Sequence, residues 1–284
     1  MPLNYERIMA FRPADQPVSY GPRDCIIYAL GIGIGMDPMD QAQLRFVYEK
    51  DLVAFPTLMA VIGRLGRSLS GPEFGVDPRM MVAASLKVVL HEPVATEGKL
   101  TSRPRVREVI DKGPNSAAII ELTRDLIAPD GRVVATVDNS NLARKHGGFG
   151  GKVTEIALPH QVPATPPQRV VELPTPANLA LLYRLTGDLN PLHSDPEHAR
   201  AVGFERPILH GAATYGVAAH AVVRHIDYRA EQLASIEARF VRPVFPGDTL
   251  HTEIWQDGSR ISFQCGVAGR EGYVLTNGLA TLRS

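Results

Sequence analysis

An internal duplication is the feature that most restricts how this chain can fold. Laid over each other at a shift of about 150 residues, the two halves show weak local matches that recur in one order. Together, three matches at a nearly constant shift indicate that one structural unit occurs twice. The matching pairs of segments are 26–30 with 181–185, 60–63 with 213–216, and 93–94 with 243–244.

A proline-rich segment separates the two halves. Residues 158–176 contain prolines at positions 159, 163, 166, 167, 174 and 176. Proline lacks an amide donor and resists helix, so this segment is expected to be an extended linker with one strand over 169–173. We therefore expect an N-terminal unit over residues 1–157, a linker over 158–176 and a C-terminal unit over 177–284.

Each unit shows the same order of expected elements, namely a short helix, a second helix and then strands. The helices are expected over 24–30 and 57–65, and over 178–185 and 211–225. Hairpin turns are expected at 130–131, 257–258 and 271–272. A helix followed by an antiparallel meander predicts an α+β fold in which the sheet wraps around the helix. The strands are expected over 106–110, 116–123, 132–138, 235–241, 249–255, 261–267 and 273–281.

Composition excludes several classes of partner. Thirty basic and thirty acidic residues cancel, whereas nucleic-acid and anionic-membrane binders usually carry a basic excess. No run of 18 apolar residues exists, so no membrane span is expected. Cys25 and Cys265 stand far apart in apolar surroundings, which is typical of buried thiols in a reducing compartment. Because the first ten residues lack a signal-peptide core, we expect a cytoplasmic location.

One short loop carries the groups that point to chemistry. Asp188 and His193 lie five residues apart, and Asn190 and a proline stiffen the chain between them. Gly211 then opens an alanine-rich helix, where backbone amides and the helix dipole favour negative charge. A base, an acid and a helix N-terminus are the parts needed to move a proton beside a polarised carbonyl. The matching positions of the first unit lack these groups, so a single active site supplied by the C-terminal unit is expected.

Other motifs are given structural interpretations. The glycines at 31, 33 and 35 resemble part of a dinucleotide fingerprint, but position 36 is methionine and no βαβ pattern surrounds them, so we expect a turn. His193, His198 and His210 lack the spacing of a metal-binding motif, and no metal is expected. Residues 147–151 are almost all glycine and form a loop that a ligand can approach closely.

Residues 183–193 read Tyr-Arg-Leu-Thr-Gly-Asp-Leu-Asn-Pro-Leu-His, and this run resembles the signature of the MaoC-like, R-specific enoyl-CoA hydratases (hydratase type 2). It is similar to the hydratase unit of peroxisomal multifunctional enzymes. Residues 239–247 resemble a second family stretch, and 98–100, 111–113 and 148–151 resemble the N-terminal half of the two-unit members. The resemblance covers nearly the whole chain.

The resemblance implies a double hot-dog fold, in which two antiparallel sheets each wrap a central helix and pack as a pseudo-dimer. It implies reversible syn hydration of a trans-2-enoyl-CoA to a (3R)-3-hydroxyacyl-CoA in a homodimer. No cofactor is implied, because CoA is part of the substrate. The catalytic positions implied are Asp188, His193, Asn190 and the amide of Gly211. The substrate- or CoA-binding positions implied are Lys112, Phe240, Gly150 and Gly151.

One departure from the family bears on the acyl group. Family members often carry a His-Gly-Glu-Gln run where this chain has Ala-Ala-Ser-Leu at 83–86, so side-chain contacts from that stretch are not expected. Gly63 and Gly66 interrupt the expected second helix of the first unit, at about 1 kcal/mol each against alanine. A shortened helix leaves a gap that we expect to receive the apolar part of a substrate. Alanine at both glycines should then impair bulky substrates more than small ones.

Three alternatives remain open from the sequence. A hot-dog thioesterase would cleave saturated acyl-CoA by directing water at the carbonyl carbon. A non-catalytic acyl-CoA-binding subunit would not need the groups at 188, 193 and 211. A dehydratase would act on a carrier-protein thioester, and the neutral net charge does not decide for or against that acidic partner. Fatty acyl and steroid side chains both remain possible substrates.

Overall fold

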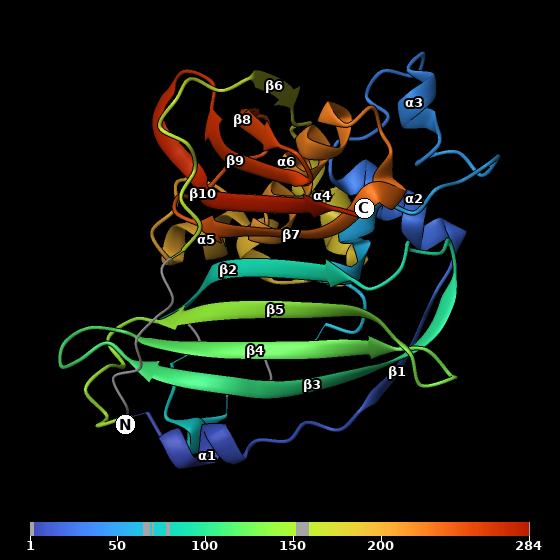
Figure 1. The fold of residues 1–284 in the computed structure, drawn as a ribbon. Helices are drawn as coiled ribbons and strands as arrows, with labels where there is room; N and C mark the ends of the chain where they lie inside the picture. The colour runs from blue at the N-terminus through green and yellow to red at the C-terminus, as the bar shows by residue number, and fades with distance from the viewer. Residues whose placement is uncertain (1–2, 65–68, 70, 78–79, 152–158, 284) are drawn as a thin grey trace.

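The computed structural model describes residues 3–64, 69, 71–77, 80–151 and 159–283. Its strands form one antiparallel ten-stranded sheet in the order β1-β3-β4-β5-β2-β7-β10-β9-β8-β6 (Figure 1). The strands of the first half are β1 (Gln16–Tyr20), β2 (Met81–Leu90), β3 (Gly98–Asp111), β4 (Ala118–Ile127) and β5 (Val133–Ala143). Those of the second half are β6 (Arg169–Pro174), β7 (Leu233–Phe240), β8 (Thr249–Asp257), β9 (Arg260–Val267) and β10 (Arg270–Leu282).

The helices are short, with one exception. The α-helices are α1 (Tyr5–Ala10), α2 (Pro22–Gly31), α3 (Gln41–Leu44), α4 (Leu179–Tyr183), α5 (Pro196–Ala201) and α6 (Gly211–His225). The 3₁₀ helices are η1 (Pro56–Ala60), η2 (Pro72–Phe74), η4 (Arg184–Thr186), η5 (Pro191–His193) and η6 (Ala230–Gln232). The α+β class is therefore confirmed. The strand expected over 169–173 is also confirmed, as β6, at one edge of the sheet.

The two halves meet where β2 pairs with β7. The register runs from Ser85 opposite Arg239 to Val89 opposite Ser235. The two sheets implied by the resemblance are therefore joined edge to edge into one, and each half keeps its own set of strands. The reason is that the edges of both sheets carry unpaired backbone groups, which satisfy one another when β2 and β7 lie side by side.

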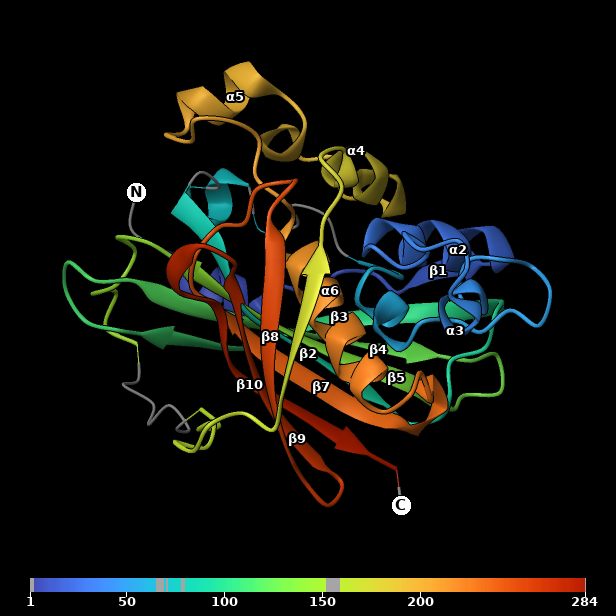
Figure 2. The same cartoon turned by 90° about the horizontal axis from the view of Figure 1, so that it is seen from above.

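The core of the second half is α6, which lies across the sheet (Figure 2). Eleven consecutive residues of this helix, 213–223, are buried. Most of these side chains are alanine or valine, with Thr214 and His220 as buried polar exceptions, so the helix is mainly apolar and suits a central position. It packs on strands of both halves, including β2 and β7, and on η1. The helix expected over 211–225 is thus confirmed.

The first half has no counterpart of α6 among its described residues. Over residues 57–64, the described part of the helix expected over 57–65, the chain forms the end of the five-residue η1 and then a turn at Gly63 with φ of +60°. A Cβ at Gly63 would strike the side chain of Ser102, so alanine there would displace the turn rather than lengthen a helix. The proposed double-alanine test is therefore unsuitable, and Gly66 lies outside the described residues.

The duplication is visible in the pairing of α2 with α4, the two helices whose sequences match. Tyr28 and Tyr183 lie at corresponding positions, and their ring centroids are 6.1 Å apart. A Cβ at Gly31 would stand 3.3 Å from the backbone of Tyr183, so glycine allows the helices to approach closely. The expected turn after residue 31 is confirmed, because Gly33 and Gly35 both have positive φ.

The turns confirm two hairpins and correct a third. Gly131 and Gly258 have positive φ between β4 and β5 and between β8 and β9. The turn between β9 and β10 lies at Ala268 and Gly269 instead of 271–272. Gly272 falls in a register shift within β10, where glycine tolerates a φ of +82°. Sequence analysis also missed α1, β1, β2 and α5.

Gly216 in the middle of α6 tests whether packing or helix propensity governs this helix. Alanine has the higher helix propensity by about 1 kcal/mol. However, a Cβ at Gly216 would strike Ile32, and both Ile32 and Tyr28 beside it are fully buried and unable to move away. Overpacking of this kind costs about 1–3 kcal/mol. We expect Gly216→Ala to lower the free energy of unfolding in urea titrations, and an unchanged or higher value would contradict this packing.

Candidate functional site

Three local backbone features determine the conformation of the loop between α4 and α5. Gly187 has φ of +113°, which ends η4 and turns the chain toward Asp188. The side chain of Asn190 accepts a hydrogen bond from the backbone N–H of Leu192 and thereby caps η5. Proline at the first position of η5 needs no amide partner. His193 ends η5 and is therefore held in a defined place.

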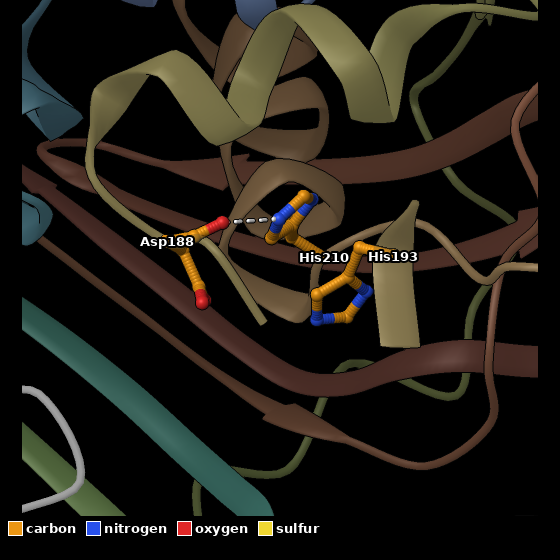
Figure 3. Close-up of side chains that lie close together, drawn as sticks. All are labelled: Asp188, His193 and His210. Atoms are coloured by element: carbon orange, nitrogen blue, oxygen red, sulfur yellow. Dashed lines mark hydrogen bonds between the residues drawn. The ribbon is translucent and has the colours of Figure 1, made fainter. Parts of the chain in front are cut away.

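This loop brings Asp188 and His193 together with His210, the residue at the N-cap of α6 (Figure 3). One potential ligand atom from each of the three side chains lies within 4.8 Å of the other two. The imidazole rings of His193 and His210 stack, with centroids 3.8 Å apart and planes 28° apart. Residues separated by more than 20 positions in the sequence thus form one cluster.

Hydrogen bonds define the tautomer of each imidazole. Nδ1–H of His193 donates to the carbonyl oxygen of Ile208 at 2.9 Å, which leaves Nε2 with a free lone pair. Nε2–H of His210 donates to the carbonyl oxygen of Asp188 at 3.1 Å. Burial lowers the pKa of His193 and lowers that of His210 to about 3, so both rings are neutral at pH 7. His193 is therefore a neutral base, and His210 ties the loop to the start of α6.

Asp188 is ionised despite its burial. Its side chain is 17% exposed, and burial on its own raises the pKa of its carboxyl group. Arg64 of the first half lies 2.5 Å from Oδ2 and outweighs this effect, so the pKa of Asp188 is lowered. The backbone N–H of Asn190 donates to Oδ1 at 3.3 Å. The site therefore pairs a carboxylate with a neutral imidazole.

Gly211 and Phe240 lie next to each other beside this cluster. Gly211 is the first residue of α6, and no side chain caps the start of this helix. The first amides of a helix have no partner within the helix and can bind an oxygen that carries negative charge. A Cβ at Gly211 would lie 3.4 Å from the ring of Phe240, which stands at the end of β7. The start of α6 and the end of β7 are therefore in close contact, with the backbone of Gly211 facing this ring.

The remaining predicted binding residues lie on loops of the first half. Lys112 is exposed at the end of β3, and Gly150 and Gly151 follow β5. Asp111 joins these loops, because its carboxylate accepts hydrogen bonds from the amides of Gly113, Gly148 and Gly150 at 2.8, 2.6 and 3.0 Å. The Asp111 carboxylate thus ties these loops together. Residues 83–86, where this chain differs from the family run, lie in β2, and Ser85 pairs with Arg239 of β7.

Asp188, His193 and His210 also have the donor types of a metal site. Two observations argue against such a site here. Arg64 already places a positive charge against the Asp188 carboxylate, where a cation would bind. His193 and His210 are stacked face to face, and one nitrogen of each ring is used to hold the backbone. The arrangement fits proton transfer better than ligation.

The sequence does not predict the roles of three residues that shape the site. His210 is weighed there only as a possible metal ligand and as the residue before Gly211, and Asp111 only as part of a run that resembles the family. Arg64 lies 124 positions from Asp188, and no local pattern connects the two residues. The sequence signal available for Asp111 is an acidic residue followed by Lys-Gly, together with a glycine-rich loop. Its burial is seen only in the structure.

Comparison with known proteins assigns the family. A MaoC like domain matches residues 159–277, and the MFE-2 hydratase 2 N-terminal domain matches residues 18–144. The chain belongs to the MaoC-like dehydratases, and it has the double hot-dog architecture of that class. Within this class it belongs with the two-unit hydratase 2 proteins, because both domain types are present and relatives of that name match along its full length.

Individual relatives share most of their length with this chain. It is 35% identical to the peroxisomal enoyl-CoA hydratase 2 of Arabidopsis thaliana, covering 98% of this chain and 97% of that protein. It is 37% identical to 3-hydroxyacyl-thioester dehydratase Y of Mycobacterium tuberculosis, covering 88% and 87%. The solved MaoC-like dehydratase of Phytophthora capsici superposes with a TM-score of 0.87 at 30% identity, covering 99% of both chains. No helix among the described residues has the length and apolar character that a bilayer span requires.

Asp111→Asn tests whether this carboxylate holds the binding loops. The bound amides outweigh the effect of burial and lower the pKa of Asp111. A lowered pKa contributes stability above the pKa of the unfolded chain, and that contribution is lost as the pH falls through the folded value. We expect Asp111→Asn to be less stable than the wild type at about pH 7, with the difference shrinking at about pH 3. Urea unfolding at both pH values measures this.

Asp15→Asn is the matched control for that experiment, because Asp15 is an exposed partner of Arg103 on the same half. We expect a small effect at either pH, since exposed ion pairs contribute little. If Asp111→Asn behaved like this control, the carboxylate would not be holding the loops.

Proposed function

We propose that this protein catalyses the reversible hydration of a trans-2-enoyl-CoA to a (3R)-3-hydroxyacyl-CoA. The observation that carries the proposal is the pairing of an ionised Asp188 with a neutral His193 at the start of α6. The names of the matched relatives support the same reaction class. We further propose that it acts in fatty-acyl or steroid side-chain β-oxidation.

The proposed reaction begins with a water molecule held by Asp188 and His193. Both groups accept its hydrogens, which leaves an oxygen lone pair free to attack the electron-poor β-carbon of the enoyl thioester. An O–H bond of the water breaks as the new C–O bond forms, and the released proton passes to the α-carbon from the same face. Positioned acid–base groups contribute about 10² to 10⁴ in rate.

Negative charge builds on the thioester oxygen during this attack. The amide of Gly211 supplies a hydrogen bond at a helix start, where the dipole also favours negative charge. One such donor contributes about 10² to 10³ in rate. Asn190 acts indirectly in this proposal, because its side chain caps η5 and so fixes His193.

The rest of the substrate is proposed to bind mainly to the first half. The proposed CoA contacts are Lys112, Gly150 and Gly151 of the first half and Phe240 at the end of β7 in the second half. The proposed units are an N-terminal unit over residues 1–157, a linker over 158–176 and a C-terminal unit over 177–284. A cavity of about 210 Å³ beside η1 has an apolar part formed by Met59, Leu100 and Val134 among others. This cavity lies at the β2–β3 and β4–β5 connections, whereas Phe240 lies near the start of β2. We propose that the space beside η1 receives the apolar part of an acyl group.

A dehydratase that acts on a 3-hydroxyacyl thioester is the second candidate. It uses the same site in the reverse direction, and the dehydratase relative supports it. A thioesterase is less well supported, because Gly211 and the paired acid and base serve addition at the β-carbon without a nucleophile aimed at the carbonyl carbon.

Asp188→Asn and His193→Ala test the proposed roles. Each variant removes one of the two groups that hold water, so we expect turnover of a trans-2-enoyl-CoA to fall by about 10² to 10⁴. Binding of the CoA ester should change little, because neither residue is a proposed CoA contact. Loss of absorbance of the conjugated thioester measures the rate, and chiral chromatography of the product should give the (3R) alcohol.

His198→Ala is the matched control, since this histidine lies five residues further along the chain on α5 and outside the cluster. It should retain wild-type turnover. Near-normal activity in Asp188→Asn or His193→Ala would rule out the assignment, and release of free CoA from a saturated acyl-CoA would favour the thioesterase.

We also propose that the reaction needs no metal or organic cofactor. Arg64 occupies the position beside Asp188 that a metal ion would take, which supports this view. Dialysis against a strong chelator should therefore leave turnover unchanged. Loss of activity that is restored by added zinc would instead identify Asp188, His193 and His210 as ligands.

We also propose that the protein forms a homodimer and is located in the cytoplasm. Leu181, Leu185 and Leu189 are 55–61% exposed along α4 and the site loop, which supports an interface between copies of this chain.

A further inference from the structure

We propose that Arg64 is a positioning residue for Asp188, so that both halves of the chain contribute to one active site. In this role Arg64 holds the carboxylate in a single orientation and keeps it ionised. The inference rests on the hydration proposed above and extends it, because the first half then does more than bind substrate.

The contacts of the carboxylate support this role. Arg64 Nη1 lies 2.5 Å from Oδ2 of Asp188, and the backbone N–H of Asn190 donates to Oδ1 at 3.3 Å. A donor on each oxygen prevents the carboxylate from rotating. Each carboxylate oxygen has more than one lone pair, so a water molecule can still donate to it.

Charge supports the same role. The described groups that act on Asp188 are Arg64, His193 and His210, and Tyr183 packs beside His210. Burial lowers the pKa of both imidazoles and raises that of the Tyr183 hydroxyl, so all three are neutral at pH 7. Arg64 is therefore the permanent cation of this group. Without it, burial would raise the pKa of Asp188 and favour the protonated form, which cannot accept a proton from water.

The chain before Arg64 is held in place by the rest of the first half. Arg124 of β4 is buried and donates to the carbonyl oxygens of Met59, Ala60 and Ile62 at the end of η1. The carbonyl oxygens at a helix end carry partial negative charge, which suits a buried guanidinium. The hydroxyl of Ser102 donates to the carbonyl oxygen of Gly63 at 2.8 Å.

This anchoring separates the Arg64–Asp188 pair from an ordinary surface salt bridge. An exposed pair contributes little, partly because two long side chains must be ordered to form it. Here the backbone adjacent to Arg64 is already fixed by Ser102 and Arg124, and the partner carboxylate is largely buried. The first half thus presents Arg64 to the site on a rigid support.

The pH dependence of Arg64→Gln tests the proposal. Arg64 lowers the pKa of Asp188 and also that of His193, so its loss raises both values. The acidic limb of kcat/KM, which reports the free enzyme, should therefore move to higher pH. A misplaced carboxylate should also lower kcat at about pH 7 by up to about 10²-fold, with little change in KM. Arg64→Lys keeps the charge and should retain most of the wild-type pH profile.

Arg105→Gln is the matched control. Arg105 lies 2.6 Å from Asp125, and the two side chains are 45% and 19% exposed, against 46% and 17% for Arg64 and Asp188. This variant should keep the wild-type rate and pH profile. Ser102→Ala loosens the support of Arg64 and should shift the acidic limb in the same direction as Arg64→Gln, by a smaller amount.

The outcomes separate this inference from the proposed function. A wild-type acidic limb and rate in Arg64→Gln, while Asp188→Asn is inactive, would overturn the role of Arg64 alone. Failure of the wild type to hydrate any enoyl-CoA would overturn the function itself. If Arg64→Gln did not fold, Arg64→Lys and Ser102→Ala would decide. A Ser102→Ala profile identical to the wild type, together with an Arg64→Lys acidic limb that moves to higher pH although the charge is kept, would contradict the proposal.

Discussion

The pairing of β2 with β7 is the constraint on which the site depends. This antiparallel contact joins two half-sheets at a fixed register and lets α6 pack on both of them. A shift of one residue would turn every side chain of β7 to the opposite face and would remove Phe240 from Gly211. The same contact fixes the first half relative to the second, so that Arg64 reaches Asp188. The pairing of the sheet backbone therefore fixes the relative positions of the side chains at the site.

Burial shifts the pKa values of the two central groups of the site in opposite directions. It disfavours the charged form of each, so it lowers the pKa of His193 and keeps the imidazole neutral, but it also acts to raise the pKa of Asp188. The structure resolves this conflict by adding one cation, Arg64, beside the carboxylate. A site with the correct residues but without this charge would not keep a carboxylate next to a neutral imidazole so readily.

The two copies of the ancestral unit have diverged in a complementary way. Their first helices remain alike and pack together through Tyr28 and Tyr183. The second copy keeps a long central helix whose start is part of the site, whereas the first copy keeps only η1 and a turn at Gly63. Arg64 follows that turn directly and contacts Asp188 of the second half. The two copies therefore contribute different parts to one cluster of side chains.

The sequence by itself determined the duplication, the α+β class, the helix at 211–225 and the pairing of Asp188 with His193. These features depend on local patterns, such as apolar periodicity, proline content and a short motif, which can be read along the chain. It missed β2, because this central strand shows no clear alternation, and it extended a helix through Gly63, where φ is positive.

Only the tertiary structure decided that the two sheets are continuous, that His210 ties the loop to α6, and that Arg64 and Asp111 shape the site. Each of these depends on residues that are distant in the sequence and meet only when β2 and β7 are paired. The protonation states follow from the same cause, because burial and neighbouring charge are properties of the folded environment and not of the residue type.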